Sequence, residues 1–145
     1  MSSCAVAAAA LLWLAAGPQG MREEPPLPPP AVAHEPLFAD IMARARTLKA
    51  QADGIKTGGP VTEDFRRGVR ELSELDMKAH FVLAERKVDG DLKCILKGIA
   101  EDLPQKLKAL DEAKAPMARK AAVEDMTYLL NDNVEVIAAP PAPAA

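Results

Sequence analysis

Hydrophobic residues recur every three or four positions from residue 36 to residue 138, the spacing that places side chains on one face of a helix. Two glycine-containing turns and one further proline interrupt this pattern. The pattern therefore predicts four helices. The first begins at Pro36, the second follows an N-cap at Thr62 and reaches about Lys87, the third follows a cap at Asp91, and the fourth begins at Pro116.

Each predicted helix has one inner face, and aliphatic side chains supply most of its positions. These positions are Leu37, Phe38, Ile41, Met42, Ala45, Leu48, Ala52 and Ile55 in the first helix; Phe65, Val69, Leu72, Leu75, Ala79, Val82 and Leu83 in the second; Leu92, Ile95, Leu96, Ile99, Leu103, Leu107 and Leu110 in the third; and Met117, Ala121, Ala122, Met126, Leu129, Leu130, Asn133 and Ile137 in the fourth. Four such helices with short connections pack most simply as an antiparallel, up-down-up-down four-helix bundle. One long helix over residues 62–113 would give three helices instead. No segment has the alternating pattern of a strand, so the predicted fold class is all-α.

Pro104 lies inside the third helical pattern, where proline removes a backbone hydrogen bond and disturbs the helix. The apolar stripe continues on both sides of this proline. We therefore expect either a kink or a short break in which Asp102 caps a new start.

The two ends of the chain differ in composition from the helical part. Residues 3–16 form an uncharged apolar run about as long as a signal-peptide core, so residues 1–20 are predicted to be a signal peptide, with an uncleaved N-terminal anchor as the alternative. Residues 21–34 are predicted to be a proline-rich linker, 35–138 the helical bundle domain, and 139–145 a disordered Ala/Pro tail. A signal peptide implies a periplasmic or secreted protein.

Acidic and basic residues alternate along the chain, and the net charge is −3. Even the densest basic patch, formed by Arg66, Arg67 and Arg70, has acidic residues interleaved with it. Nucleic-acid binding needs a continuous basic stripe, so no nucleic-acid partner is expected. We expect a protein or cell-envelope partner or a homodimer, and membrane contact only if the N-terminal apolar segment stays uncleaved.

Few side chains in the helical part suit catalysis or metal binding, and no motif of a metal site, nucleophile or phosphate loop occurs. His80 lies one position off the apolar stripe and is therefore expected at a helix boundary or on the surface. Cys94 is the cysteine that remains once a cleaved leader removes Cys4, so we expect a buried thiol or an intermolecular bond. Asn133 lies on the inner face, where it is expected to hydrogen-bond across the bundle.

The last predicted helix contains Glu124-Asp125, Met126 and Leu130-Asn131-Asp132-Asn133 followed by Val136-Ile137, and it resembles the first helix of the soluble periplasmic b-type cytochromes. Asp64-Phe65-Arg66 with Gly68 resembles the start of the third helix of that family, so the two motifs occur here in permuted order. The resemblance implies a four-helix bundle and a periplasmic address. The haem-binding methionine of the family falls on Thr127 here, so a haem site would need His80 with Met126 or another methionine.

The sequence thus favours an exported helical bundle with a non-catalytic binding role and no cofactor. A periplasmic haem- or metal-binding carrier is the alternative, motivated by His80, by the methionines and by the resemblance. A helical chaperone is a third possibility, and it would require an exposed apolar groove.

Overall fold

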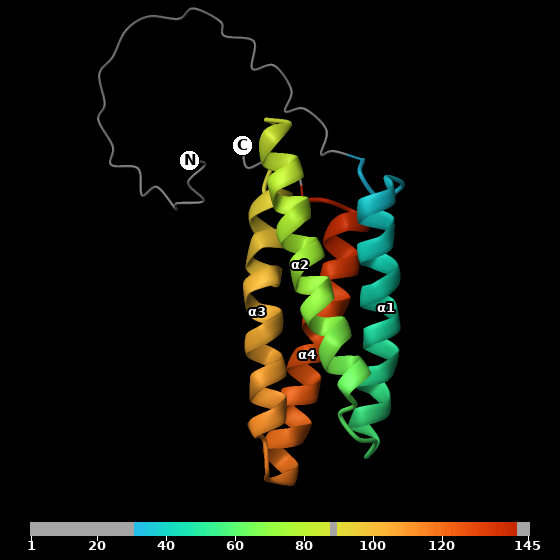
Figure 1. The fold of residues 1–145 in the computed structure, drawn as a ribbon, viewed down its shortest axis with the longest axis vertical. Coiled ribbons are helices and arrows are strands. Elements are labelled where there is room, and N and C mark those ends of the chain that lie inside the picture. The colour runs from blue at the N-terminus through green and yellow to red at the C-terminus, as the bar shows by residue number, and fades with distance from the viewer. Residues whose placement is uncertain (1–30, 88–89, 142–145) are drawn as a thin grey trace, which may run out of the picture.

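The computed structural model describes residues 31–87 and 90–141. Within these ranges every regular element is a helix: α1 is Pro36–Lys56, α2 is Glu63–Glu85, α3 is Leu92–Glu112 and α4 is Pro116–Ala138. The four helices lie side by side along their length (Figure 1). The predicted all-α fold with four helices is confirmed. The predicted leader and most of the proline-rich linker lie outside the described residues, as does the end of the C-terminal tail.

The helices begin close to the predicted positions. The side-chain oxygen of Thr62 accepts a hydrogen bond from the backbone N–H of Phe65 at 3.1 Å, as an N-cap residue does. Pro36 and Pro116 stand in the first turns of α1 and α4, where a missing N–H breaks no helical bond. Asp91 is the N-cap residue of α3, as predicted, but its side chain makes no capping hydrogen bond.

Each helix packs against two neighbours: α1 contacts α2 and α4, and α3 also contacts α2 and α4. Helices α2 and α4 therefore lie diagonally across the bundle. Partners on α1 and α2 pair in opposite numerical order, with Leu48 beside Gly68, Arg44 bonded to Glu71, and Glu35 just before α1 bonded to Arg86 just after α2. Figure 1 shows the connections between successive helices at alternate ends of the bundle.

The core contains most positions of the predicted aliphatic faces, but Ala121 is exposed and Val82 is only partly buried, and two further differences concern Met117 and Val32. Met117 is 77% exposed, so its predicted inner position is wrong. Met117 precedes the buried Met126 by nine residues, which is two and a half helical turns and points it away from the core. Val32 is buried although it was assigned to the linker, so the core extends a few residues before α1.

Helix α3 continues through Pro104 without a break, so the expected new start capped by Asp102 is wrong. Proline at this position leaves the carbonyl of Ala100 without its usual helical donor. The hydroxyl of Ser73 on α2 donates to that oxygen at 2.6 Å. A neighbouring helix therefore supplies the hydrogen bond that proline removes.

Candidate functional site

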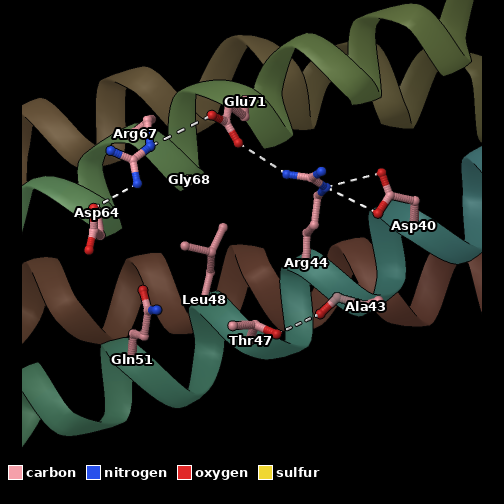
Figure 2. A pocket seen from close by; sticks show the side chains of 10 residues that line it. All are labelled: Asp40, Ala43, Arg44, Thr47, Leu48, Gln51, Asp64, Arg67, Gly68 and Glu71. Carbon is pink, nitrogen blue, oxygen red and sulfur yellow. Dashed lines mark hydrogen bonds and ion pairs between the residues drawn. The ribbon is translucent and has the colours of Figure 1, made fainter.

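A groove runs between α1 and α2 on the outside of the bundle, with a volume of about 460 Å³ (Figure 2). Its lining residues are Asp40, Ala43, Arg44, Thr47, Leu48, Gln51, Asp64, Arg67, Gly68 and Glu71. A Cβ atom at Gly68 would lie 2.8 Å from Cδ2 of Leu48, so glycine allows the two helices to approach closely at this point. We call this feature the α1–α2 groove.

Five charged side chains form a continuous chain of ion pairs along the α1–α2 groove. Figure 2 shows Arg44 donating to Asp40 on its own helix and to Glu71 on α2, with N···O distances of 3.0 Å to each. Glu71 also contacts Arg67 at 3.8 Å, and Arg67 donates to Asp64 at 2.6 Å. Glu71 therefore lies between both arginines, and its contact with Arg44 links the two helices.

These ion pairs are open to solvent and individually weak. The side chains of Arg44 and Glu71 are 43% and 46% exposed, and exposed pairs of this kind contribute roughly 0 to 1 kcal/mol each. The hydrogen bond with Asp40 raises the pKa of Arg44 above its ordinary value, which keeps the guanidinium charged. The ion pairs hold the charged groups of the groove in place, but replacing them with ion pairs to a bound molecule would lose little free energy.

The uncharged polar groups of the groove differ in their hydrogen bonding. The hydroxyl of Thr47 donates to the carbonyl oxygen of Ala43 on its own helix at 3.0 Å. Gln51 is exposed, and within the described ranges its amide makes no hydrogen bond with protein. An amide in this state offers both donors and an acceptor to a bound molecule.

A second polar feature lies in the middle of the core. Asp76 on α2 and Asn133 on α4 are both 0% exposed, and Asn133 Nδ2 donates to Asp76 Oδ2 at 2.7 Å. The bond joins the two diagonal helices, so the cross-bundle contact predicted for Asn133 is present. Burial raises the pKa of Asp76 from 3.8 to about 8, although the hydrogen bond from Asn133 lowers it.

Sequence reasoning did not find Asp76, although a signal was present. The buried positions of α2 run through residues 69, 72, 76, 79 and 83, with alternating steps of three and four. Asp76 occupies one of these steps, and the neighbouring Leu75 was assigned to the inner face instead. Leu75 is only partly buried, so the regular spacing was a better guide than hydrophobicity at this position.

His80 is buried, with 6% of its surface exposed, so its expected location at a boundary or on the surface is wrong. It follows Asp76 by four residues and therefore shares the inward side of α2. Its Nδ1 lies 2.6 Å from the carbonyl oxygen of Lys93 on α3. Because a carbonyl only accepts, Nδ1 carries the proton of this bond, and in the neutral ring Nε2 keeps its lone pair.

The structure does not bring His80 and Met126 together. Helices α2 and α4 run in the same direction (Figure 1), and the bond between Asp76 and Asn133 sets their relative level. With a rise of about 1.5 Å per residue, His80 lies about 6 Å beyond that level and Met126 about 10 Å before it. This separation greatly exceeds two metal–ligand bonds of about 2 Å each, so one iron does not reach both side chains in this arrangement.

Cys94 is half-buried in the first turn of α3 and is disulfide-bonded. The expectation of a buried free thiol is therefore wrong, whereas the alternative of an intermolecular bond stays a prediction. That expectation assumed that Cys4, the other cysteine of the chain, leaves with a cleaved leader. Cys4 lies outside the described residues.

No helix in the described part of the chain is long and apolar enough to cross a membrane. Over the same residues, no group of three or more histidine, cysteine or acidic side chains is placed to hold a metal ion. No protein-family model matches the chain, and no significant match occurs among curated proteins or solved structures.

Proposed function

We propose that this protein is an exported, non-catalytic interaction protein that binds its partner in the α1–α2 groove. The observation that supports this proposal is the groove itself. It carries side chains of both charges beside the amide of Gln51, which makes no hydrogen bond with the described part of the protein. Its volume of about 460 Å³ lies within the range of roughly 300 to 1,000 Å³ typical of binding pockets. The partner is a protein or a cell-envelope component, and a second copy of the chain is one such protein.

The ion pairs of the groove suit the binding of a polar segment that carries both an acidic and a basic side chain. Such a segment would replace existing pairs with new ones, and each exposed pair that is lost contributes at most about 1 kcal/mol. Complementary charges also orient a partner and speed its association. We infer that the groove selects its partner mainly by the arrangement of charge.

Two further parts of the proposal concern export and architecture. The apolar run at residues 3–16 supports a signal peptide and a periplasmic or secreted location. The opposite numerical order of partners on α1 and α2 supports an antiparallel, up-down-up-down bundle. The net charge of −3 supports a partner other than nucleic acid.

The groove proposal predicts where a ligand perturbs the protein. We expect peptides of mixed charge, titrated into the full chain, to shift backbone amide resonances over residues 43–51 and 64–71. Arg44→Glu would place a third carboxylate beside Asp40 and Glu71, and we expect it to weaken peptide binding by at least about tenfold.

Arg46→Glu is the matched control for this experiment. It makes the same charge change on the same helix, but residue 46 is exposed and does not line the groove. Equal loss of binding in both variants, or shifts that avoid the groove, would contradict the proposed site. Sustained turnover of a substrate that one point mutation abolishes would contradict the non-catalytic role.

A haem or metal carrier is the second candidate, and the bond from His80 Nδ1 to the carbonyl of Lys93 favours it. Metal-binding histidines use such a bond to orient the ring and present the other nitrogen. If this function is correct, we expect protein purified from the compartment to which it is exported to show a Soret band or bound metal that His80→Ala removes. A colourless, metal-free protein would eliminate this candidate and leave the groove proposal intact.

A further inference from the structure

The bond between Asp76 and Asn133 leaves two oxygen atoms without a partner. Asp76 Oδ1 and Asn133 Oδ1 are fully buried and make no hydrogen bond, although Oδ2 and Nδ2 of the same side chains are 2.7 Å apart. An ionised carboxylate and an amide oxygen are both acceptors, so they cannot satisfy each other. Buried polar atoms are nearly always hydrogen-bonded, and such a pair therefore requires an explanation.

We propose that Asp76 is a neutral carboxylic acid in the folded bundle and donates its proton to Asn133 Oδ1, closing a ring of two hydrogen bonds that opens when the proton is lost. A carboxylic acid and a primary amide each present one donor and one acceptor side by side. With Nδ2 already bonded to Oδ2, the atoms of the two groups that still lack a partner are the two orphaned oxygens. One proton satisfies both of them.

The surroundings of Asp76 favour the neutral form. Of the residues that the structure describes, only Asp76, His80 and Asn133 are buried polar or charged side chains. His80 lies one turn away on the same helix, and its Nδ1 is already bonded to the carbonyl of Lys93. An ionised Asp76 would therefore have no buried positive partner on α1, α3 or α4, and burial of an unpaired charge is strongly unfavourable.

At the height of Asp76 along the bundle axis, the charged side chains of α1, α3 and α4 lie on the surface of the bundle. Asp40 and Arg44 on α1 are exposed and bonded to each other. Lys97 on α3 pairs with Glu101, and Asp132 on α4 is partly buried beside Asn133 in sequence. Burial of the carboxyl is accordingly the largest influence on the pKa of Asp76, which rises to about 8.

Proton linkage gives this proposal a measurable sign. Between pH 3.8, the ordinary pKa of the group, and pH of about 8, the folded state holds a proton that the unfolded state has lost. The contribution of Asp76 to the free energy of unfolding is therefore fully present below pH 3.8, the pKa in the unfolded chain. It is lost as the pH rises toward about 8, the pKa in the folded chain. The folding equilibrium constant falls about tenfold for each pH unit over that window.

The test compares denaturant unfolding of the full chain and of Asp76→Asn at several pH values, followed by circular dichroism. Between pH 5 and pH 8 we expect the folding constant of the wild-type chain to fall roughly five hundredfold relative to that of Asp76→Asn. Asp132→Asn is the matched control, because it makes the same change next to Asn133 on a side chain that is not fully buried, and it should keep the wild-type slope. Equal slopes for wild type and Asp76→Asn would overturn the proposal.

Infrared spectroscopy of the wild-type chain provides a second test that does not depend on a folded variant. With carboxyl-labelled aspartate, we expect the carbonyl stretch of a protonated carboxylic acid at pH 6 and its loss above a pH of about 8 to 9. Absence of this band at pH 6 in the folded protein would overturn the proposal. Neither measurement involves the α1–α2 groove, so failure here would leave the proposed binding function untouched.

Discussion

Asn133→Leu is expected to destabilise the bundle by about 3 kcal/mol at pH 7, although leucine is an ordinary core residue. The substitution removes the Nδ2 donor that lies 2.7 Å from Asp76 Oδ2 and leaves the carboxyl of Asp76 buried without a partner. An unsatisfied buried polar group costs roughly 1 to 3 kcal/mol when neutral, and breaking a buried pair that leaves a charge costs about 3 to 5 kcal/mol. Urea unfolding followed by circular dichroism measures this change.

The double variant Asp76→Leu/Asn133→Leu separates the hydrogen bond from the shape of the site. Because it removes both polar groups together, we expect its free energy of unfolding to equal or exceed that of the wild-type chain. A single Asn133→Leu variant as stable as wild type would show that the amide is not what satisfies Asp76. A double variant as unstable as the single one would attribute the loss to poor packing of leucine.

If the double variant is more stable, the polar pair has a role other than stability. Helices α2 and α4 do not pack directly against each other, and the bond between Asp76 and Asn133 joins them through the core. Sliding either helix along its axis by one turn, about 5.4 Å, would break this bond and bury both polar groups unpaired. Aliphatic side chains tolerate such a shift far better, so the pair specifies the relative level of the diagonal helices.

The fold could be predicted because its determinants are periodic and local. Apolar spacing identified the four helices, and the N-cap of Thr62 followed from residue type alone. The error at Met117 came from counting an apolar residue as inner without checking its phase against Met126. Phase along a helix is contained in the sequence, so this error was avoidable.

The candidate sites were harder to predict because they depend on contacts between helices. The pairs of Arg44 with Asp40 and of Arg67 with Asp64 follow from helical spacing, but the contact of Arg44 with Glu71 needs the packing of α1 on α2. His80 was expected outside the core because it lies one position off the apolar stripe of the second helix. Its partner is a backbone carbonyl of α3, which residue type cannot reveal.

Pro104→Ala is expected to stabilise the bundle by roughly 1 to 3 kcal/mol, the second large effect that the structure predicts. Alanine restores an N–H that can donate to the carbonyl of Ala100, and it removes the contact of the proline ring with that carbonyl. The gain is limited because proline also restricts the unfolded chain, an effect of about 0.4 to 1 kcal/mol in the opposite direction. Thermal and urea unfolding of the two chains measure the difference.

The same substitution should change the contribution of Ser73. In the wild-type chain the hydroxyl of Ser73 donates to the buried carbonyl of Ala100 at 2.6 Å, so Ser73→Ala is expected to cost about 1 to 2 kcal/mol. In the Pro104→Ala background the helix supplies its own donor to that oxygen, and we expect the cost of Ser73→Ala to fall by about half or more. Equal costs in both backgrounds would show that Ser73 stabilises the bundle for a reason unrelated to the proline. A smaller cost beside alanine would instead establish that α2 satisfies the carbonyl left open by Pro104, which explains how α3 continues through a proline in its interior.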